Sequence, residues 1–177
     1  MSIERPDETT RKAQTLKDIS AMRRSYGVDG ITDLGDDPIA AFTGWLHEAA
    51  DNEFIVEANA MVLSTVADNQ PTSRTVLLKD LTQDGFTFFS NYNSRKAGEI
   101  EKSKNVSLLF PWYPLERQVI VIGVASKISK TESEKYFATR PRGSQIGAWA
   151  SAQSTELSSR GELEEKFATF EAKWPIG

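Results

Sequence analysis

The sequence predicts an α+β domain in which a mostly antiparallel β-sheet or barrel is surrounded by peripheral helices. Three observations support this. The 177-residue chain has the length of a single domain. Five short segments rich in β-branched and apolar residues follow one another in its middle, separated by turn-rich stretches. Helical periodicity is found mainly before and after them, which favours a meandering sheet over βαβ units.

The individual elements follow from local signals. Residues 36–52 predict a helix, because Asp37 can cap it and Pro38 suits the first helical position. A shorter helix is expected over residues 94–103, with Ser94 as its cap. We expect residues 1–20 to be a flexible N-terminal segment and residues 21–177 to form one domain. The predicted strands are residues 59–68, 72–80, 85–91, 105–112 and 116–129.

Helices are also expected after the last strand. Thr131 with Glu134, and Ser159 with Glu162, have the spacing of a capping box, in which two residues satisfy each other's free backbone amides. Apolar residues then recur at helical spacing close to the end of the chain.

Composition excludes several classes of function. The net charge of −4 does not indicate a nucleic-acid partner, which usually requires a basic excess. The chain has no cysteine, which excludes disulfides, thiolate metal sites and thiol nucleophiles. The first residues lack the apolar run of a secretory signal, and the apolar stretch 119–125 is far shorter than the roughly 20 residues of a membrane helix. A cytoplasmic protein without a membrane partner is therefore expected.

A first candidate anion site lies where the third strand gives way to the short helix, in "FFSNYNSRKAGEI". Ser90 and Ser94 offer hydroxyl groups, Arg95 and Lys96 offer positive charge, and the helix N-terminus offers free backbone amides. Together these groups suit a phosphate monoester. The alternative is a solvated cationic pair beside an ordinary serine cap.

A second candidate anion site is the segment "KYFATRPRGSQIG". Tyr136 and Arg140 are four residues apart and therefore share a helix face, and Ser144 follows the break at Pro141. A phenol, a guanidinium and a hydroxyl group can surround a second phosphate. The alternative is an exposed Arg140 beside a Tyr136 that packs in the core.

Other chemistry is not supported, and no catalytic residue or metal ligand is predicted. His47 is the single histidine and occupies a surface position of its helix, which argues against a metal site or a serine–histidine triad. The acidic residues are expected on helix surfaces such as 99–103 and 161–166, which argues against a carboxylate pair. No glycine-rich phosphate loop is found. Two anion sites without acid–base groups are typical of a protein whose cofactor carries the reaction.

Several long motifs together resemble the pyridoxine/pyridoxamine 5′-phosphate oxidase family. They are "AMVLSTV", "SRTVLLKD", "FFSNYNSRKAGEIE", "VSLLFPWYPLERQVIVIG", "YFATRPRGSQIGAWAS" and "QSTELSSRGELEEKF", in the family's order and nearly its spacing. The similarity runs from about Met22 to Phe170. It implies an FMN-binding split β-barrel in a homodimer, with FMN at the subunit interface. It also implies oxidation of pyridoxamine or pyridoxine 5′-phosphate to pyridoxal 5′-phosphate, with O2 reoxidising the flavin to give H2O2.

The resemblance also implies site residues by motif position. Arg95 and Lys96 would bind the flavin phosphate, Gln118 would bond to the flavin ring, and Lys79 would reach the substrate phosphate. The implied FMN contacts are Arg74, Thr75, Val76, Leu77, Leu78, Lys79, Phe89, Ser90, Arg95, Lys96, Gln118, Gln153 and Ser154. The implied substrate contacts are Arg23, Arg24, Ser25, Tyr26, Lys79, Tyr136, Arg140 and Ser144.

One departure from the family leaves alternatives open. The sequence stops at "KWPIG", before the C-terminal segment that in the family supplies further strands and further FMN and substrate contacts. We expect a truncated family domain. The first alternative is a binding module that holds FMN or pyridoxal phosphate without turnover. The second, a split-barrel flavin reductase or a haem-degrading relative, would share the fold but not "YFATRPRGSQIGAWAS".

Overall fold

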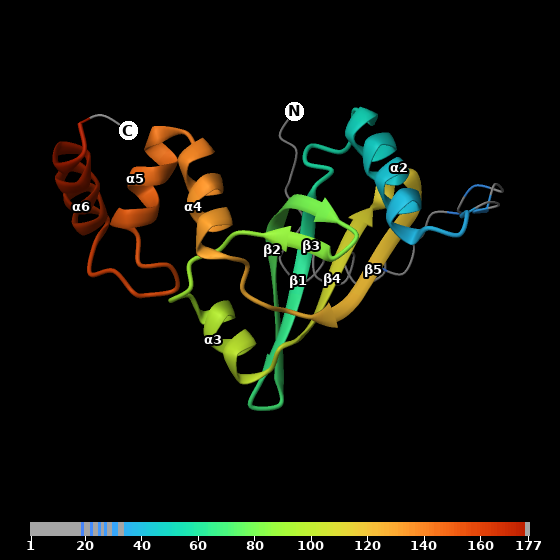
Figure 1. Ribbon diagram of the computed structural model, residues 1–177, viewed down its shortest axis with the longest axis horizontal. Helices are drawn as coiled ribbons and strands as arrows, with labels where there is room; N and C mark the ends of the chain where they lie inside the picture. Colours follow the sequence, from blue (N-terminus) through green and yellow to red (C-terminus); the bar gives the residue numbers. More distant parts are fainter. Residues whose placement is uncertain are drawn as a thin grey trace, which may run out of the picture. The chain divides into compact units, whose positions relative to one another are not determined.

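The computed structural model describes residues 34–175 without a gap and, before them, Ile19, Met22, Ser25, Gly27, Gly30 and Ile31. Residues Gly35–Gly177 form one compact unit, and residues Met1–Leu34 form another. All elements below belong to the unit that begins at Gly35 (Figure 1). None of the helices in the described part of the chain is long and apolar enough to cross a membrane.

The core of this unit is an antiparallel sheet with the strand order β3-β2-β1-β4-β5, curled into a half barrel (Figure 1). A two-residue turn, Asp68 and Asn69, joins the first two strands, and both residues have the positive φ of the tight hairpin turn that matches strand twist. The predicted antiparallel, barrel-like sheet is confirmed. Its strands are β1 (Ala60–Ala67), β2 (Gln70–Thr82), β3 (Gly85–Phe88), β4 (Asn105–Trp112) and β5 (Arg117–Val124).

Helix α2 (Pro38–Asp51) closes one end of the sheet. As predicted, Asp37 caps it, and the carboxylate accepts from the amide of Ile39 at 2.8 Å. The ring of Phe42 lies 5.0 Å from that of Phe86 and 4.8 Å from that of Phe110, both in edge-on contact. Buried aromatic and aliphatic side chains thus fix this end of the sheet in place.

The remaining helices are α3 (Arg95–Lys102), α4 (Lys130–Thr139), α5 (Arg142–Ala150) and α6 (Arg160–Lys173), and a short 3-10 turn, η1 (Tyr113–Leu115), precedes β5. The capping box predicted for α4 was wrong by two residues. Ser129 is the cap and Glu132 its partner, because the helix starts two residues earlier than predicted. Ser159 caps α6 as predicted, although the Glu162 carboxylate reaches Ser158 instead.

Candidate functional site: a buried charged cluster beside helix α3

Helix α3 packs against β1 near the β1–β2 turn (Figure 1). Two of its charged side chains are buried. Lys96 is 8% exposed and Glu99 is 7% exposed. The expectation that Glu99 lies on a helix surface was therefore wrong. Lys96 and Glu99 are three residues apart and share the face that meets the sheet, whereas Arg95 is exposed.

Strand register brings Arg74 to this helix. Arg74 pairs with Leu63, which is fully buried, and directly paired residues of antiparallel strands lie on the same face. Two positions along, Thr72 pairs with the buried Thr65. The inner face of β1 and β2 thus changes from apolar to polar where α3 covers it. The buried polar side chains at this place need hydrogen-bond partners.

A closed hydrogen-bond network satisfies these groups. Arg74 donates through Nη1 to Thr65 Oγ1 and through Nη2 to Thr72 Oγ1, each at 2.5 Å. Arg74 Nη2 also donates to Glu99 Oε2 at 2.6 Å. Both threonine hydroxyls donate to the same carboxylate oxygen, Thr65 at 2.6 Å and Thr72 at 2.8 Å. Every member of the network is thereby fixed by at least two others.

The second oxygen of Glu99 holds Arg95. Arg95 Nε donates to Glu99 Oε1 at 2.8 Å, while the side chain stays 66% exposed. Burial alone would raise the pKa of the Glu99 carboxyl, but hydrogen bonds from Thr65, Thr72, Arg74 and Arg95 outweigh burial and lower this pKa to about 2. Glu99 is therefore ionised at neutral pH, and its carboxylate orders two guanidinium groups.

Lys96 and the loop before α6 form the other side of the cluster. Lys96 Nζ donates to Gln153 Oε1 at 2.9 Å and to Ser94 Oγ at 3.4 Å. Ser94 is the N-cap of α3, as predicted, but its hydroxyl makes no capping bond. Ser90 Oγ donates to the same Gln153 oxygen at 3.4 Å. Burial and the Arg74 charge lower the pKa of Lys96, and Glu99 partly opposes them.

The chemistry of this donor set suits a phosphate monoester. Arg74, Arg95 and Lys96 carry three positive charges and Glu99 one negative charge, so the cluster has a net charge of +2 when Lys96 is protonated. A phosphomonoester carries about −1.5 to −2 at pH 7. Among the described residues, no acceptor bonds to the Nη atoms of Arg95. These donors and the α3 amides are available to an anion.

The other residues implied as FMN contacts extend along β2 and β3. Leu78 is buried and Asn59 bonds both of its backbone polar groups, at 2.8 and 2.9 Å. Lys79 is exposed where the β2–β3 register shifts between Leu78 and Asp80. Thr75 is exposed, Val76 and Leu77 are half-buried, and Ser154 has the positive φ of 69° that is uncommon for a residue other than glycine.

Gln118 lies away from the cluster. It is exposed on β5, where it alternates with the half-buried Arg117 and Val119, and it pairs with Pro111. Ile120 and Ile122 follow at the next two positions of the same face, and they are 56% and 83% exposed. Within this chain the structure therefore does not bring Gln118 together with Arg95 and Lys96.

The second predicted anion site is assembled in part. The Tyr136 ring stacks on Phe89, with centroids 3.6 Å apart and planes 10° from parallel, which joins α4 to the end of β3. Arg140 is the C-cap of α4 and lies over the Phe137 ring at 5.8 Å. Ser144 is exposed in the first turn of α5. Tyr136 and Arg140 are both half-buried, so neither alternative for this segment holds in full.

Part of the implied N-terminal substrate segment lies outside the described residues, namely Arg23, Arg24 and Tyr26. Ser25 is described and exposed, and it belongs to the unit Met1–Leu34. The role of this segment stays a prediction.

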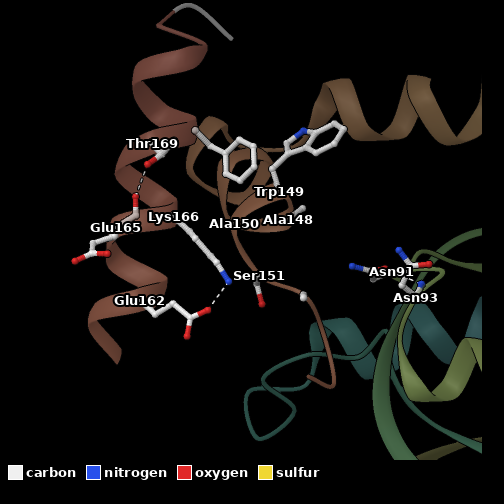
Figure 2. A pocket seen from close by; sticks show the side chains of 12 residues that line it. Asn91, Asn93, Ala148, Trp149, Ala150, Ser151, Glu162, Glu165, Lys166 and Thr169 are labelled. Atoms are coloured by element: carbon white, nitrogen blue, oxygen red, sulfur yellow. Dashed lines mark hydrogen bonds and ion pairs between the residues drawn. The ribbon is translucent and has the colours of Figure 1, made fainter. Parts of the chain in front are cut away.

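A pocket of about 810 Å³ lies beside the cluster, between the β3–α3 loop and helices α5 and α6 (Figure 2). Asn91 and Asn93 line one side. Its ionisable side chains are Glu162, Glu165 and Lys166, and Lys166 is already paired with Glu162 at 2.5 Å. With two carboxylates and one paired cation, this pocket does not suit a phosphate. Among the described residues, no group of three or more histidine or acidic side chains is arranged to hold a metal ion.

Comparison with known proteins supplies the family context. A family model described as pyridoxamine 5′-phosphate oxidase matches residues 47–174. The chain is 50% identical over 163 residues to pyridoxine/pyridoxamine 5′-phosphate oxidase from Crocosphaera subtropica, covering 90% of this chain and 76% of that protein. It is 45% identical over 168 residues to the protein of the same name from Streptomyces avermitilis, covering 92% and 75%.

Two solved structures resemble the fold. PhzG from Burkholderia lata, solved with tetrahydrophenazine-1-carboxylic acid, aligns with a TM-score of 0.78 and 25% identity over 86% of this chain and 77% of that one. A pyridoxamine 5′-phosphate oxidase-related, FMN-binding protein from Nostoc punctiforme aligns with a TM-score of 0.55 and 19% identity, over 77% and 73%. The second likeness concerns the fold alone.

Proposed function

Because the chain belongs to the pyridoxamine 5′-phosphate oxidase family, we propose that it oxidises pyridoxamine or pyridoxine 5′-phosphate to pyridoxal 5′-phosphate with FMN as cofactor and O2 as electron acceptor. H2O2 would be the second product. The observation that carries this proposal is the net charge of +2 at the start of α3, where Arg74 and Arg95 pair with Glu99 and Lys96 is bonded to Ser94 and Gln153. A flavin that ends in a phosphate monoester needs such a site, whereas uncharged riboflavin does not.

The residues present fit FMN. Arg95 and Lys96 would hold its phosphate, with Ser90 and Gln153 beside them and Arg74 behind. When bound, FMN accepts a hydride from the carbon that carries the substrate amine or alcohol. The chain itself contributes position and charge. It binds the phosphate in a partly buried setting, where charge-assisted hydrogen bonds are stronger than in water.

The substrate side would be formed by Lys79, Tyr136, Arg140 and Ser144, as the family resemblance implies. The stack of Tyr136 on Phe89 supports this assignment, because Phe89 directly follows Phe88, which pairs with Leu78 next to Lys79. The segment from Arg140 to Ser144, which leads from α4 into the first turn of α5, is thereby linked to β2 next to Lys79. A cation at Lys79 and another at Arg140 suit the single phosphate of the substrate.

We further propose that two copies of the chain form the complete site. Gln118 shares the outer face of β5 with exposed Ile120, Ile122 and Val124, and an exposed apolar edge of this kind favours burial against another subunit. A second copy seated on this face would bring its own residues to the Gln118 region. This dimer, like a cytoplasmic location, remains a proposal.

The oxidation is tested by loading the purified chain with FMN, removing oxygen and adding pyridoxamine 5′-phosphate while flavin absorbance is followed. We expect the flavin band to bleach and to recover when air is admitted, with pyridoxal 5′-phosphate appearing in step. Bound flavin that never bleaches would refute oxidase activity and favour a protein that binds FMN without turnover.

A further inference from the structure

Glu99 is the member of the cluster for which the proposed oxidation has no use. Its side chain is 9% exposed, and both of its oxygens are occupied, Oε2 by Thr65, Thr72 and Arg74 and Oε1 by Arg95. Glu99 binds two arginines that come from different elements, Arg74 from β2 and Arg95 from α3.

The direction of each hydrogen bond in this network is fixed by chemistry. A guanidinium group can only donate, and an ionised carboxylate can only accept. Each threonine hydroxyl has one hydrogen. Thr65 and Thr72 therefore accept from Arg74 and donate to Glu99, and the reverse arrangement is impossible. Glu99 thus orients Arg74 directly and through two hydroxyl relays.

We propose that Glu99 is the positioning residue of the flavin phosphate site. Its carboxylate holds the guanidinium groups of Arg74 and Arg95 in place, one through each oxygen, before FMN binds. This inference rests on the proposed function, namely that the chain binds FMN by its phosphate. Preorganised donors bind an anion more tightly than free ones, because the side-chain entropy has already been lost on folding.

The charge of Glu99 and its positioning role have opposite effects on FMN affinity. The proposal can therefore be tested by whether FMN affinity rises or falls when the charge is removed. Removing the negative charge of Glu99 raises the net charge of the cluster from +2 to +3. If charge alone mattered, FMN would bind more tightly. If position matters more, FMN binds more weakly despite the added positive charge.

The experiment measures the affinity of the full chain for FMN and for riboflavin by quenching of flavin fluorescence. We compare the wild type, Glu99→Gln and the matched control Glu101→Gln. Glu101 lies two residues away in α3 and pairs with Lys127 at 2.9 Å, with both side chains about 60% exposed, so the control makes the same charge change outside the cluster.

For Glu99→Gln we expect FMN affinity to fall about tenfold or more, which corresponds to about 1.4 kcal/mol, with riboflavin affinity unchanged. Glu101→Gln should change neither affinity. Unchanged or tighter FMN binding in Glu99→Gln would overturn the proposal, and so would an equal loss for both flavins, which indicates a general structural role. A wild type that does not prefer FMN to riboflavin would reject the proposed function together with this inference.

Because Glu99 is buried, a second and milder variant keeps the proposal testable if Glu99→Gln fails to fold. Thr72→Val removes one relay between Arg74 and Glu99 at a half-buried position and leaves every charge unchanged. We expect a smaller loss, about threefold or more, that affects FMN and spares riboflavin. Equal FMN affinity in Thr72→Val and wild type would contradict the positioning role.

Discussion

The buried hydroxyl of Thr65 is expected to stabilise the fold far more than its size suggests. Thr65 is 1% exposed, and its hydroxyl joins Arg74 at 2.5 Å to Glu99 at 2.6 Å. Thr65→Val nearly preserves volume and removes both bonds. Hydrogen bonds to charged groups contribute about 1.5–3 kcal/mol each, and Glu99 keeps other partners, so we expect a loss of about 2–4 kcal/mol in the free energy of unfolding.

Urea unfolding of the chain without ligand, followed by tryptophan fluorescence, measures this loss. For a chain of this length the melting temperature should fall by about 2–4 °C per kcal/mol, and therefore by at least about 4 °C. The control is Ser64→Ala, which removes a hydroxyl pair with Ser73 at 2.9 Å in an exposed part of the same β1–β2 ladder and should cost under about 1 kcal/mol. A Thr65→Val variant within about 0.5 kcal/mol of wild type would refute the reasoning.

Three further outcomes are expected. Lys96→Met should weaken FMN binding about tenfold or more in a fluorescence titration. Its melting temperature should be unchanged or higher, because burial and Arg74 lower the pKa of Lys96 and disfavour its charged form. A lower melting temperature would contradict this. Tyr136→Phe keeps the stack on Phe89 and loses only the hydroxyl. KM for the phosphorylated substrate should therefore rise about threefold to tenfold while FMN affinity stays the same. An unchanged KM in steady-state kinetics would contradict this prediction. The difference in free energy of unfolding between wild type and Glu99→Gln should be largest above pH 4.5 and shrink as the pH falls towards about 2. The reason is that a carboxyl whose pKa is lowered on folding stabilises the fold only while it is ionised. A difference in urea midpoints that does not change with pH would contradict this prediction.

Most of the fold could be predicted from the sequence because its signals are local. The strands carry β-branched residues bounded by turn residues, and Asp37 and Pro38 mark the start of α2 by their own backbone chemistry. The capping box of α4 was misplaced because Ser129 and Thr131, two residues apart, both offer a hydroxyl that can cap a helix. Which of them caps depends on where the chain leaves β5, and no local pattern encodes that.

The candidate site was predicted only in part, because its central residue depends on tertiary contacts. Arg95 and Lys96 stand out as a cationic pair, whereas Glu99 looks like an ordinary acidic residue of a surface helix. Its burial follows from the β1–β2 register, which places Thr65 and Thr72 opposite each other beneath α3. The sequence did contain one signal for this burial. Thr72 and Arg74 are two residues apart in a strand and therefore share a face, and polar side chains on an inner face require a buried polar partner.

The most direct test of the account is the ratio of FMN to riboflavin affinity in the wild-type chain, because the two flavins differ only in the phosphate. The cluster around Arg74, Arg95 and Lys96 should favour FMN by about 100-fold or more, the effect of two charge-assisted hydrogen bonds. Equal affinities within about threefold would show that this cluster does not bind the phosphate. That result would contradict the claim that the chain binds FMN through its phosphate.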